Sequence, residues 1–279
     1  MKKIDRPLPD GRVAIYRHPL LVRLSHAVNA LCLLALLLSG LQILNAHPAL
    51  YWGEASRFDR PFAAITQTTD AAGDLHGRLQ VGGMEFDTTG LLGASRDTSG
   101  AMQPAAFPGW LTLPAQHDLG AGRQWHFFMA WLLVANGAIY GLPGLVGGRF
   151  RRVLLPRIAE LRGIGRAIGD HMRLRFAHGE DARAYNVLQK LAYVAVIFGL
   201  LPLMVMTGLA MSPAMDARLP FLSEVLGGRQ TARSLHFLTA LSLVAFFVLH
   251  MVMVLAAGPL NELRSILTGW FVIGRKDRR

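Results

Sequence analysis

Four long stretches of the sequence are apolar and almost free of charge, and they constrain the fold more than any other feature. Each is close to the roughly 20 residues that a helix needs to cross about 30 Å of hydrocarbon. A helix of this length in a water-soluble protein normally carries a polar stripe, which these stretches lack. We therefore expect an all-α integral membrane protein, a four-helix bundle with transmembrane helices at about 22–44, 124–146, 188–211 and 232–257.

The positive charge of the chain is distributed unevenly among its connections. The net charge is +11, and 21 of the 29 Lys and Arg residues lie before residue 24, between 147 and 190, or after 258. Eight lie in the other two connections, 45–125 and 212–235. Cytoplasmic segments of membrane proteins carry such an excess of Lys and Arg. The pattern predicts a multi-pass inner-membrane protein with both termini in the cytoplasm. Membrane topology therefore explains the excess of basic residues. We expect these segments to contact the lipid bilayer and not a nucleic acid.

We expect a single membrane domain, 1–279, with two large connections. The first, 45–122, is a periplasmic insertion rich in Gly, Asp and Thr. An alternating apolar pattern broken by Gly82-Gly83 predicts a β-hairpin there, and the alternating residues are Leu79, Val81, Met84 and Phe86. A solvated mobile loop is the alternative. The second connection, 147–186, is basic and cytoplasmic, and its apolar period predicts an amphipathic helix on the membrane surface.

The single cysteine, Cys32, excludes several kinds of redox centre. One thiol cannot form an intramolecular disulfide, hold an iron–sulfur cluster, or supply the two cysteines through which haem is attached covalently. Any redox metal in this chain must therefore use His or Met as its ligand.

Four of the ten histidines fall within the expected transmembrane helices: His26, His126, His236 and His250. An imidazole in lipid is costly and usually functional. His236 and His250 are 14 residues apart, which puts both on one helix face and about 21 Å apart along the axis. The chain direction puts His236 at the outer depth of His126, and His250 at the inner depth of His26. Two facing imidazoles at each of two depths suit two six-coordinate b haems, whereas zinc normally needs three or four ligands at one depth.

An arginine precedes three of these histidines by three residues. Arg23, Arg123 and Arg233 would each lie about one turn outward from the neighbouring ligand, where haem propionates need cationic partners. The alternative is that these side chains only extend from a helix end toward water. Small residues could let a macrocycle approach the helices or could serve close helix packing, and these are Gly40, Gly137, Gly141 and Gly208.

A faint internal repeat links the two halves of the chain. Ser39-Gly40-Leu41, near the end of the first expected helix, is similar to Thr207-Gly208-Leu209 near the end of the third. Arg123, His126 and Phe127 open the second helix as Arg233, His236 and Phe237 open the fourth. The repeat predicts two helix hairpins, the first enlarged by the insertion, although matches this short can also arise by chance.

The chain resembles the bacterial di-haem cytochrome b superfamily over nearly its whole length. This group includes bacterial cytochrome b561 and the membrane subunits of formate dehydrogenase and nickel–iron hydrogenase. The most similar members are known as the cytochrome b subunit of thiosulfate reductase. The resemblance rests on Arg23-Leu24-Ser25-His26, on Arg123-Gln124-Trp125-His126-Phe127, on the His236 and His250 spacing, and on Ala257-Gly258-Pro259-Leu260-Asn261-Glu262-Leu263-Arg264.

The resemblance implies a ligand set and a role. In the family the first-helix His and the second His of the fourth helix bind the inner haem, which here are His26 and His250. The outer haem is bound by the residues that match His126 and His236. Such chains are electron-transfer subunits of a respiratory chain rather than enzymes alone. They link the quinone pool to a partner that is often a periplasmic molybdopterin oxidoreductase.

Two other functions remain open at this point. One is a stand-alone quinone-linked oxidoreductase of the cytochrome b561 type, such as a superoxide oxidase. The other is a non-redox membrane anchor or transporter. The long insertion departs from the simplest members of the superfamily and leaves the partner's identity open. We expect quinone to react near the inner haem, among the polar residues Asn29, Asn186, Gln189 and Asn261.

Overall fold

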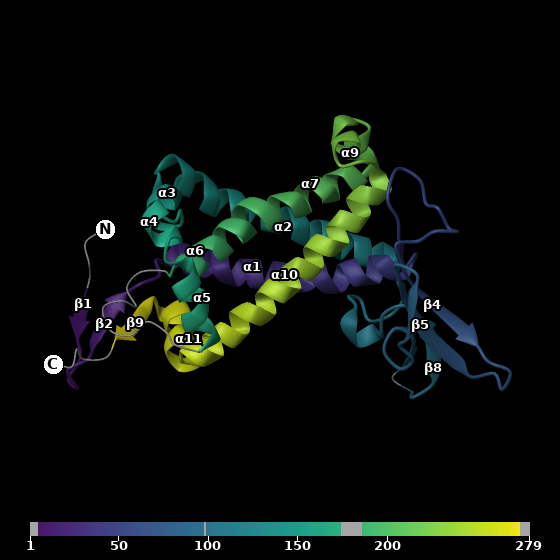
Figure 1. Ribbon diagram of the computed structural model, residues 1–279, viewed down its shortest axis with the longest axis horizontal. Coiled ribbons are helices and arrows are strands. Elements are labelled where there is room, and N and C mark those ends of the chain that lie inside the picture. The colour runs from purple at the N-terminus through teal and green to yellow at the C-terminus, as the bar shows by residue number, and fades with distance from the viewer. Residues whose placement is uncertain (1–4, 98, 174–185, 274–279) are drawn as a thin grey trace. The chain divides into compact units, whose positions relative to one another are not determined.

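The computed structural model describes residues 5–97, 99–173 and 186–273 (Figure 1). The chain divides into two compact units, which are described separately. Unit one comprises Met1–Val28, Asn136–Pro202 and Ser242–Arg279. Unit two comprises Asn29–Ala135 and Leu203–Leu241.

Four helices are long and apolar enough to cross a membrane, as the sequence predicts. They are α1 (Leu20–Asn45), α2 (Leu119–Val146), the continuous helix Val187–Met211, and α10 (Arg229–Ala257). Many of their large apolar side chains are exposed, among them Leu34 at 58%, Trp131 at 64% and Leu255 at 62%. So many exposed apolar side chains on long helices are typical of a lipid-facing surface.

The third of these helices contains a wider turn. It consists of α6 (Val187–Val194), the π-helical segment η3 (Ala195–Leu200) and α7 (Leu201–Met211). Pro202 follows the wide turn directly. A proline inside a helix cannot donate to the carbonyl four residues earlier and its ring crowds that carbonyl. The π-helical segment lies just before the proline, where a wider turn can accommodate the missing hydrogen bond and the bulk of the ring.

Unit one contains a small sheet that joins the two ends of the described chain. Its strands are β1 (Asp5–Pro7), β2 (Val13–Tyr16) and β9 (Trp270–Ile273), in the order β1-β2-β9 (Figure 1). All neighbours are antiparallel, with Val13 opposite Ile273 and Tyr16 opposite Trp270. Four membrane crossings would put both ends of a chain on the same side of the membrane. The pairing of β2 with β9 is consistent with that arrangement. The all-α expectation did not include this sheet.

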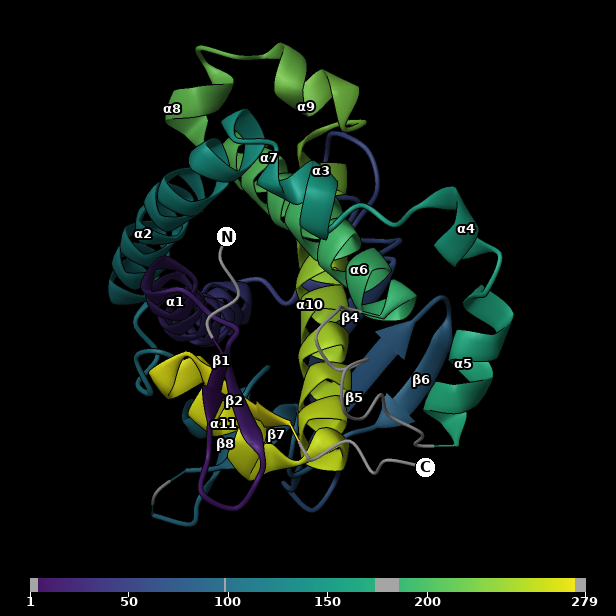
Figure 2. The same ribbon diagram turned by 90° about the vertical axis from the view of Figure 1, so that its left-hand side faces the viewer.

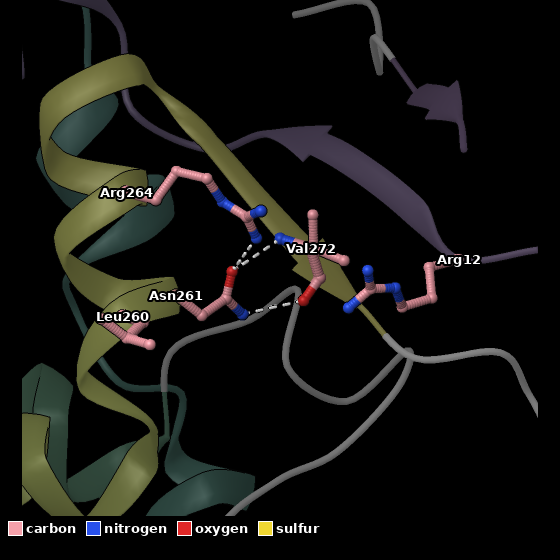
Figure 3. A pocket seen from close by; sticks show the side chains of 5 residues that line it. All are labelled: Arg12, Leu260, Asn261, Arg264 and Val272. Carbon is pink, nitrogen blue, oxygen red and sulfur yellow. Dashed lines mark hydrogen bonds between the residues drawn. The ribbon is translucent and has the colours of Figure 1, made fainter. Parts of the chain in front are cut away.

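Helix α11 (Pro259–Thr268) follows α10 after a sharp turn at Gly258 and packs on β9 (Figure 2). Asn261 makes the connection. Its side-chain Nδ2 donates to the carbonyl of Val272 at 2.8 Å, and its Oδ1 accepts from the N–H of Val272 at 3.0 Å (Figure 3). One amide side chain therefore replaces a strand partner at the edge of β9.

The basic connection of unit one forms three short helices within its described part. They are α3 (Arg149–Val153), α4 (Ile158–Leu161) and α5 (Ile164–Met172). The single amphipathic helix predicted here is wrong in its continuity, because Pro156 and Gly163 separate the segments. Residues 174–185 of this connection lie outside the described residues.

Two side-chain contacts fix the basic connection to the long helices. Lys190 donates to both oxygens of Glu160 at 2.7 and 2.8 Å. The hydrogen bond from Lys190, with one from the backbone of Arg157, lowers the pKa of Glu160 below its usual value. The buried ring of Phe150 lies against the ring of Phe198, with the ring centroids 5.6 Å apart.

Unit two contains the insertion, which folds into two small sheets. The first has the order β3-β4-β5-β6 and is antiparallel, with strands at Ala49–Leu50, Ala63–Thr69, Leu75–Val81 and Met84–Asp87. The second pairs β7 (Gly93–Arg96) with β8 (Met102–Ala105) (Figure 1). Short helices complete the unit: η1 (Gly109–Leu111), α8 (Pro213–Asp216) and α9 (Phe221–Val225).

The predicted hairpin is confirmed as β5 and β6, with Val81 opposite Met84 and Leu79 opposite Phe86. Gly82 and Gly83 form its two-residue turn with φ of 56° and 86°. Hairpin turns of this length favour positive φ at both residues, which glycine adopts without steric cost. The mobile-loop alternative does not describe this part of the insertion.

The return of the insertion to α2 is hydrogen-bonded to the last turns of α1. The Oδ1 of Asn45 accepts from the N–H of Phe107 at 2.8 Å, and the Nε2 of Gln42 donates to the carbonyl of Gln116 at 2.7 Å. Gln42 is 2% exposed. These contacts satisfy two backbone groups that the irregular loop would otherwise leave unpaired.

Gly77→Ala should loosen the insertion. A Cβ on this buried residue of β5 would lie 1.9 Å from the carbonyl oxygen of Leu92 and 2.7 Å from the N–H nitrogen of Ala94. Overpacking against rigid backbone typically costs about 1–3 kcal/mol or more. We expect faster amide hydrogen exchange across β4, β5 and β7. Gln67→Ala, at the exposed partner position on β4, is the control. Equal protection in both variants would contradict the packing described here.

Candidate functional site

The four helical histidines form two pairs, one in each unit. Pair one is His26 on α1 and His250 on α10, in unit one, with ring centroids 6.4 Å apart and ring planes inclined at 51°. Pair two is His126 on α2 and His236 on α10, in unit two, with centroids 6.2 Å apart and planes inclined at 58°. The structure therefore brings together the same partners that the depth argument paired.

The separation of the rings in each pair can be compared with that of two imidazoles on one metal. A metal–imidazole bond is about 2 Å long and the ring centroid lies about 1.1 Å beyond the nitrogen, so two imidazoles on opposite sides of one ion have centroids about 6.2 Å apart. Both pairs match this distance. No group of three or more His, Cys, Asp or Glu side chains able to hold a metal ion occurs among the described residues. A macrocycle that supplies the equatorial ligands, as haem does, fits both pairs.

Hydroxyl groups contact both imidazoles of pair two. Ser39 on α1 places its Oγ 3.1 Å from the Nδ1 of His126. Thr207 on α7 places its Oγ1 2.8 Å from the Nδ1 of His236. Both hydroxyl-bearing residues are fully buried. The sequence alone did not identify these two residues as part of a site, although they are the first residue of each Ser/Thr-Gly-Leu match in the repeat.

The glycines of the same repeat lie against the rings of pair two. A Cβ on Gly40 would be 3.3 Å from the Cε1 of His126, and a Cβ on Gly208 would be 3.5 Å from the Cε1 of His236. An imidazole ring is thus the protein group that lies closest to an added Cβ at each of these two glycines. For Gly137 and Gly141 the structure shows no atom within 4 Å of an added Cβ among the described residues.

Pair one has different surroundings. The ring of Phe246 lies nearly parallel to that of His250, with centroids 6.0 Å apart. Beside His26, the Nδ2 of Asn136 donates to the carbonyl of Ser25 at 3.0 Å, in a buried contact. Neither imidazole of pair one has a hydrogen-bond partner within the part of the chain that the structure describes. The two pairs therefore share ring spacing but differ in how their rings are held.

Each of the three predicted propionate arginines has a contact within the protein. Arg23 donates to the carbonyls of Ile266, at 3.3 Å, and Leu267, which joins the start of α1 to α11. The guanidinium of Arg233 donates to the carbonyl of His47. Arg123 is exposed, and its guanidinium carbon lies 5.8 Å from the ring centroid of Phe127. A guanidinium has five donors, so these contacts leave donors for a further anionic partner.

A pocket of about 550 Å³ adjoins the first turns of α10 in unit two. It is lined by Glu54, Ala55, Ser56, Met211, Arg229, Gln230 and Arg233. Arg233 is one helical turn before His236. The pocket therefore offers space and positive charge beside pair two.

The segment that leads into the insertion is bonded to the same turns of α10. Ser234 donates its hydroxyl proton to the carbonyl of Tyr51 at 2.6 Å, and the N–H of Gly53 donates to the hydroxyl of Thr231 at 2.7 Å. The Nε2 of His47 lies 3.1 Å from the phenol oxygen of Tyr51. Burial and then the charge of Arg233 lower the pKa of His47, so this imidazole stays neutral near pH 7. Residues 47–53 and the start of α10 thus form one hydrogen-bonded assembly.

The polar residues expected around quinone are largely used within the local structure. Asn186 caps α6, because its Oδ1 accepts from the N–H of Leu188 at 3.0 Å, and the Oε1 of Gln189 accepts from the N–H of Asn186 at 3.1 Å. Such reciprocal bonds form a capping box. Asn261 holds β9, beside a pocket of about 370 Å³ lined by Arg12, Leu260, Asn261, Arg264 and Val272 (Figure 3). These three residues act first as structural groups.

Comparison with known proteins gives one family and one relative. The family model described as prokaryotic cytochrome b561 matches residues 17–269, which include both histidine pairs. A relative from Azospira oryzae, provisionally named as subunit YedZ1 of a protein-methionine-sulfoxide reductase, is 36% identical over 136 residues. The match covers 49% of this chain and 66% of the relative, slightly under two thirds of its length. No solved structure matches the chain.

Gly208→Val should disturb pair two and leave pair one intact. The added methyl groups would meet the ring of His236, which already lies at contact distance from a single Cβ. We expect haem content, measured by pyridine haemochrome, to fall by about one haem per chain relative to the parent. Gly165→Val is the control, because Gly165 is exposed on α5, outside the long helices, and an added Cβ there meets no described atom within 4 Å. Unchanged content in the Gly208 variant would show that the glycine does not seat the ring.

Proposed function

We propose that this chain, which belongs to the prokaryotic cytochrome b561 family of haem-binding electron-transport membrane proteins, is a di-haem subunit of a larger oxidoreductase. It carries electrons across the bacterial inner membrane between the quinone pool and a partner protein. One observation carries the proposal: the chain has two histidine pairs, and each has the ring spacing of two imidazoles on one iron. A single pair would support a chain with one haem. The second pair supports electron transfer through two haems in sequence.

Each pair would hold one b haem through its two imidazoles. Haem b bound in this way supplies an iron that accepts and releases single electrons. His26 and His250 would hold the first group, and His126 and His236 the second. His126, His236 and His250 are half-buried, whereas His26 is exposed. The helices therefore shield the ligands of pair two more fully than those of pair one, and a lower local dielectric constant at pair two would strengthen electrostatic contacts to the group.

Arginine side chains would bind the haem propionates. Arg233 has the best support, because it lines the 550 Å³ pocket one turn from His236 and its guanidinium is fixed by a hydrogen bond to the carbonyl of His47. Arg229 lines the same pocket. Guanidinium groups bind carboxylates through two parallel hydrogen bonds. Arg23 and Arg123 are the corresponding candidates beside His26 and His126.

We propose that the insertion, residues 45–122, lies in the periplasm and docks the partner. Strand β6 forms an edge of its sheet, and its apolar side chains Met84 and Phe86 are 61% and 49% exposed. An unpaired strand edge with apolar side chains is a surface that another chain can extend or cover. The charge distribution of the connections, with both termini in the cytoplasm, supports this side for the insertion.

The name of the relative supports an oxidoreductase as the partner. The relative's name describes a subunit of a reductase that acts on protein methionine sulfoxide. A soluble oxidoreductase with its own redox cofactor, of the molybdopterin type, is the partner that we propose. Quinone would exchange electrons at pair one. Family membership removes the non-redox anchor or transporter from consideration. Co-purification of a soluble subunit with the full chain separates the proposal from a stand-alone quinone-linked oxidoreductase.

Purified protein should contain about two b haems per chain. The expectation follows from the two matching ring spacings, 6.4 and 6.2 Å. Pyridine haemochrome spectra, with protein measured by amino-acid analysis, give the ratio. A ratio near one would show that one pair is structural, and a ratio near zero would remove the haem proposal altogether.

The two histidines of α10 should affect different haems. His250→Ala removes a ligand of pair one, and His236→Ala removes a ligand of pair two. Each variant should lose or destabilise one spectral component in a haem-resolved redox titration of membranes, while the other component keeps its potential. His76→Ala, which affects an imidazole bonded to Asp70 on the insertion, is the control and should change neither. Loss of the same component from both α10 variants would mean that the two residues serve one site.

A further inference from the structure

We propose that Ser39 and Thr207 are positioning residues that set the tautomer and the donor strength of both pair-two imidazoles. Through the hydrogen bonds between Ser39 and His126 and between Thr207 and His236, they lower the reduction potential of the haem held by pair two. This inference rests on the proposed function, because it requires that pair two hold a haem. Ser39 and Thr207 would act through His126 and His236 and not by direct contact with the iron.

The direction of each hydrogen bond follows from counting protons. A hydroxyl has one proton to donate and two lone pairs. The Oγ of Ser39 is 2.6 Å from the carbonyl oxygen of Ala35, and the Oγ1 of Thr207 is 2.6 Å from that of Leu203. Each hydroxyl proton is therefore used on the carbonyl four residues earlier, a common bond for Ser and Thr within helices. The lone pairs that remain can only accept, so the Nδ1 of each histidine must be the donor.

This direction fixes the tautomer of both rings. A neutral imidazole carries one N–H, and the other nitrogen keeps a lone pair. With the proton on Nδ1, the lone pair of His126 and His236 is on Nε2, the nitrogen left for the iron. Ser39 and Thr207 are both 0% exposed, so water cannot take over the acceptor role if a hydroxyl is removed. The carbonyls of Leu36 and Met204 also interact with the rings of His126 and His236, and because a carbonyl can only accept, they favour the same tautomer. The other tautomer would lose this bond and place its proton where the metal bond must form.

The same bonds should increase the electron donation of the ligands. An acceptor at the second nitrogen of a metal-bound imidazole raises the basicity of the ring. Each hydroxyl donates to a carbonyl while it accepts, and such chains of hydrogen bonds polarise one another. A more basic ligand stabilises the oxidised, more positively charged iron relative to the reduced one. The reduction potential at pair two is therefore lowered.

The effect is confined to one of the two sites. The imidazoles of pair one have no hydrogen-bond partner among the residues that the structure describes, and His250 is instead stacked on Phe246. The contact at pair two occurs twice on different helices, with a serine on α1 and a threonine on α7, each followed by the glycine on which the ring lies. Two matching hydroxyls at one site and none at the other give the two sites different ligand strengths.

The test uses full-length purified protein and resolves the two haems by optical redox titration, with the low-spin electron paramagnetic resonance signals as a second readout. The variants are Ser39→Ala, Thr207→Val and their combination, with Thr207→Ser as the conservative rescue. Thr239→Val is the matched control. Thr239 is also buried on a long helix of unit two and donates to the carbonyl of Leu235 at 2.7 Å, but no histidine contact of its hydroxyl occurs among the described residues.

We expect the potential of one component to become more positive in Ser39→Ala and in Thr207→Val, and to rise further in the double variant. Thr207→Ser and Thr239→Val should keep the parent potential, and the second component should not move. Loss of one haem in Thr207→Val that is restored in Thr207→Ser would support the same role. Unchanged potentials with both haems present would overturn the proposal, as would equal shifts of both components or a Thr207→Ser variant that behaves like Thr207→Val. Absence of haem from the parent protein would instead refute the proposed function.

Discussion

An imidazole placed among apolar helices has two ring nitrogens to satisfy, and this requirement organises unit two. A buried polar group without a hydrogen-bond partner costs about 1–3 kcal/mol or more, because it cannot form a hydrogen bond with water instead. At His126 and His236 one nitrogen is used on a buried hydroxyl, at 3.1 and 2.8 Å. The two rings lie with their centroids 6.2 Å apart, which is the spacing of two imidazoles on one metal ion. A haem bound between them would use the second nitrogen of each ring.

The two pairs meet this requirement in different ways. Pair two is enclosed by short polar contacts from α1 and α7, and by glycines that leave room for the rings. Pair one is supported from outside its own helices. Arg23, one turn before His26, bonds to the end of α11, and α11 is held to β9 by Asn261. The sheet of β1, β2 and β9 therefore stabilises the turn of α1 that carries His26. This explains how short strands at the two ends of the chain contribute to a site within the long helices.

Structural features that depend on a local sequence pattern could be predicted from the sequence. Apolar runs predict the four long helices, because a membrane span needs a length that few other structures share. The depth of each histidine follows from its position on those helices, and the hairpin follows from two glycines between alternating strands. The sheet of β1, β2 and β9 was missed because Val13 and Ile273 pair across almost the whole chain, and three- or four-residue strands leave no periodic pattern. The capping and strand-pairing roles of Asn186, Gln189 and Asn261 were not predicted, because a polar residue at a helix end looks the same whether it binds a ligand or caps the backbone.

The insertion is part of the pair-two site rather than an appendage to it. Its first residues are bonded to Thr231, Arg233 and Ser234, which all lie within about two helical turns of His236. Its last residues are bonded to the turns of α1 that follow Ser39, through Gln42 and Asn45. A protein that binds the insertion would therefore act on two of the helices that position the pair-two rings: α1, which carries the hydroxyl acceptor of His126, and α10, which carries His236. Because the spacing of two imidazoles on one iron tolerates little change, the contacts that anchor the insertion also limit how far those helices can move apart.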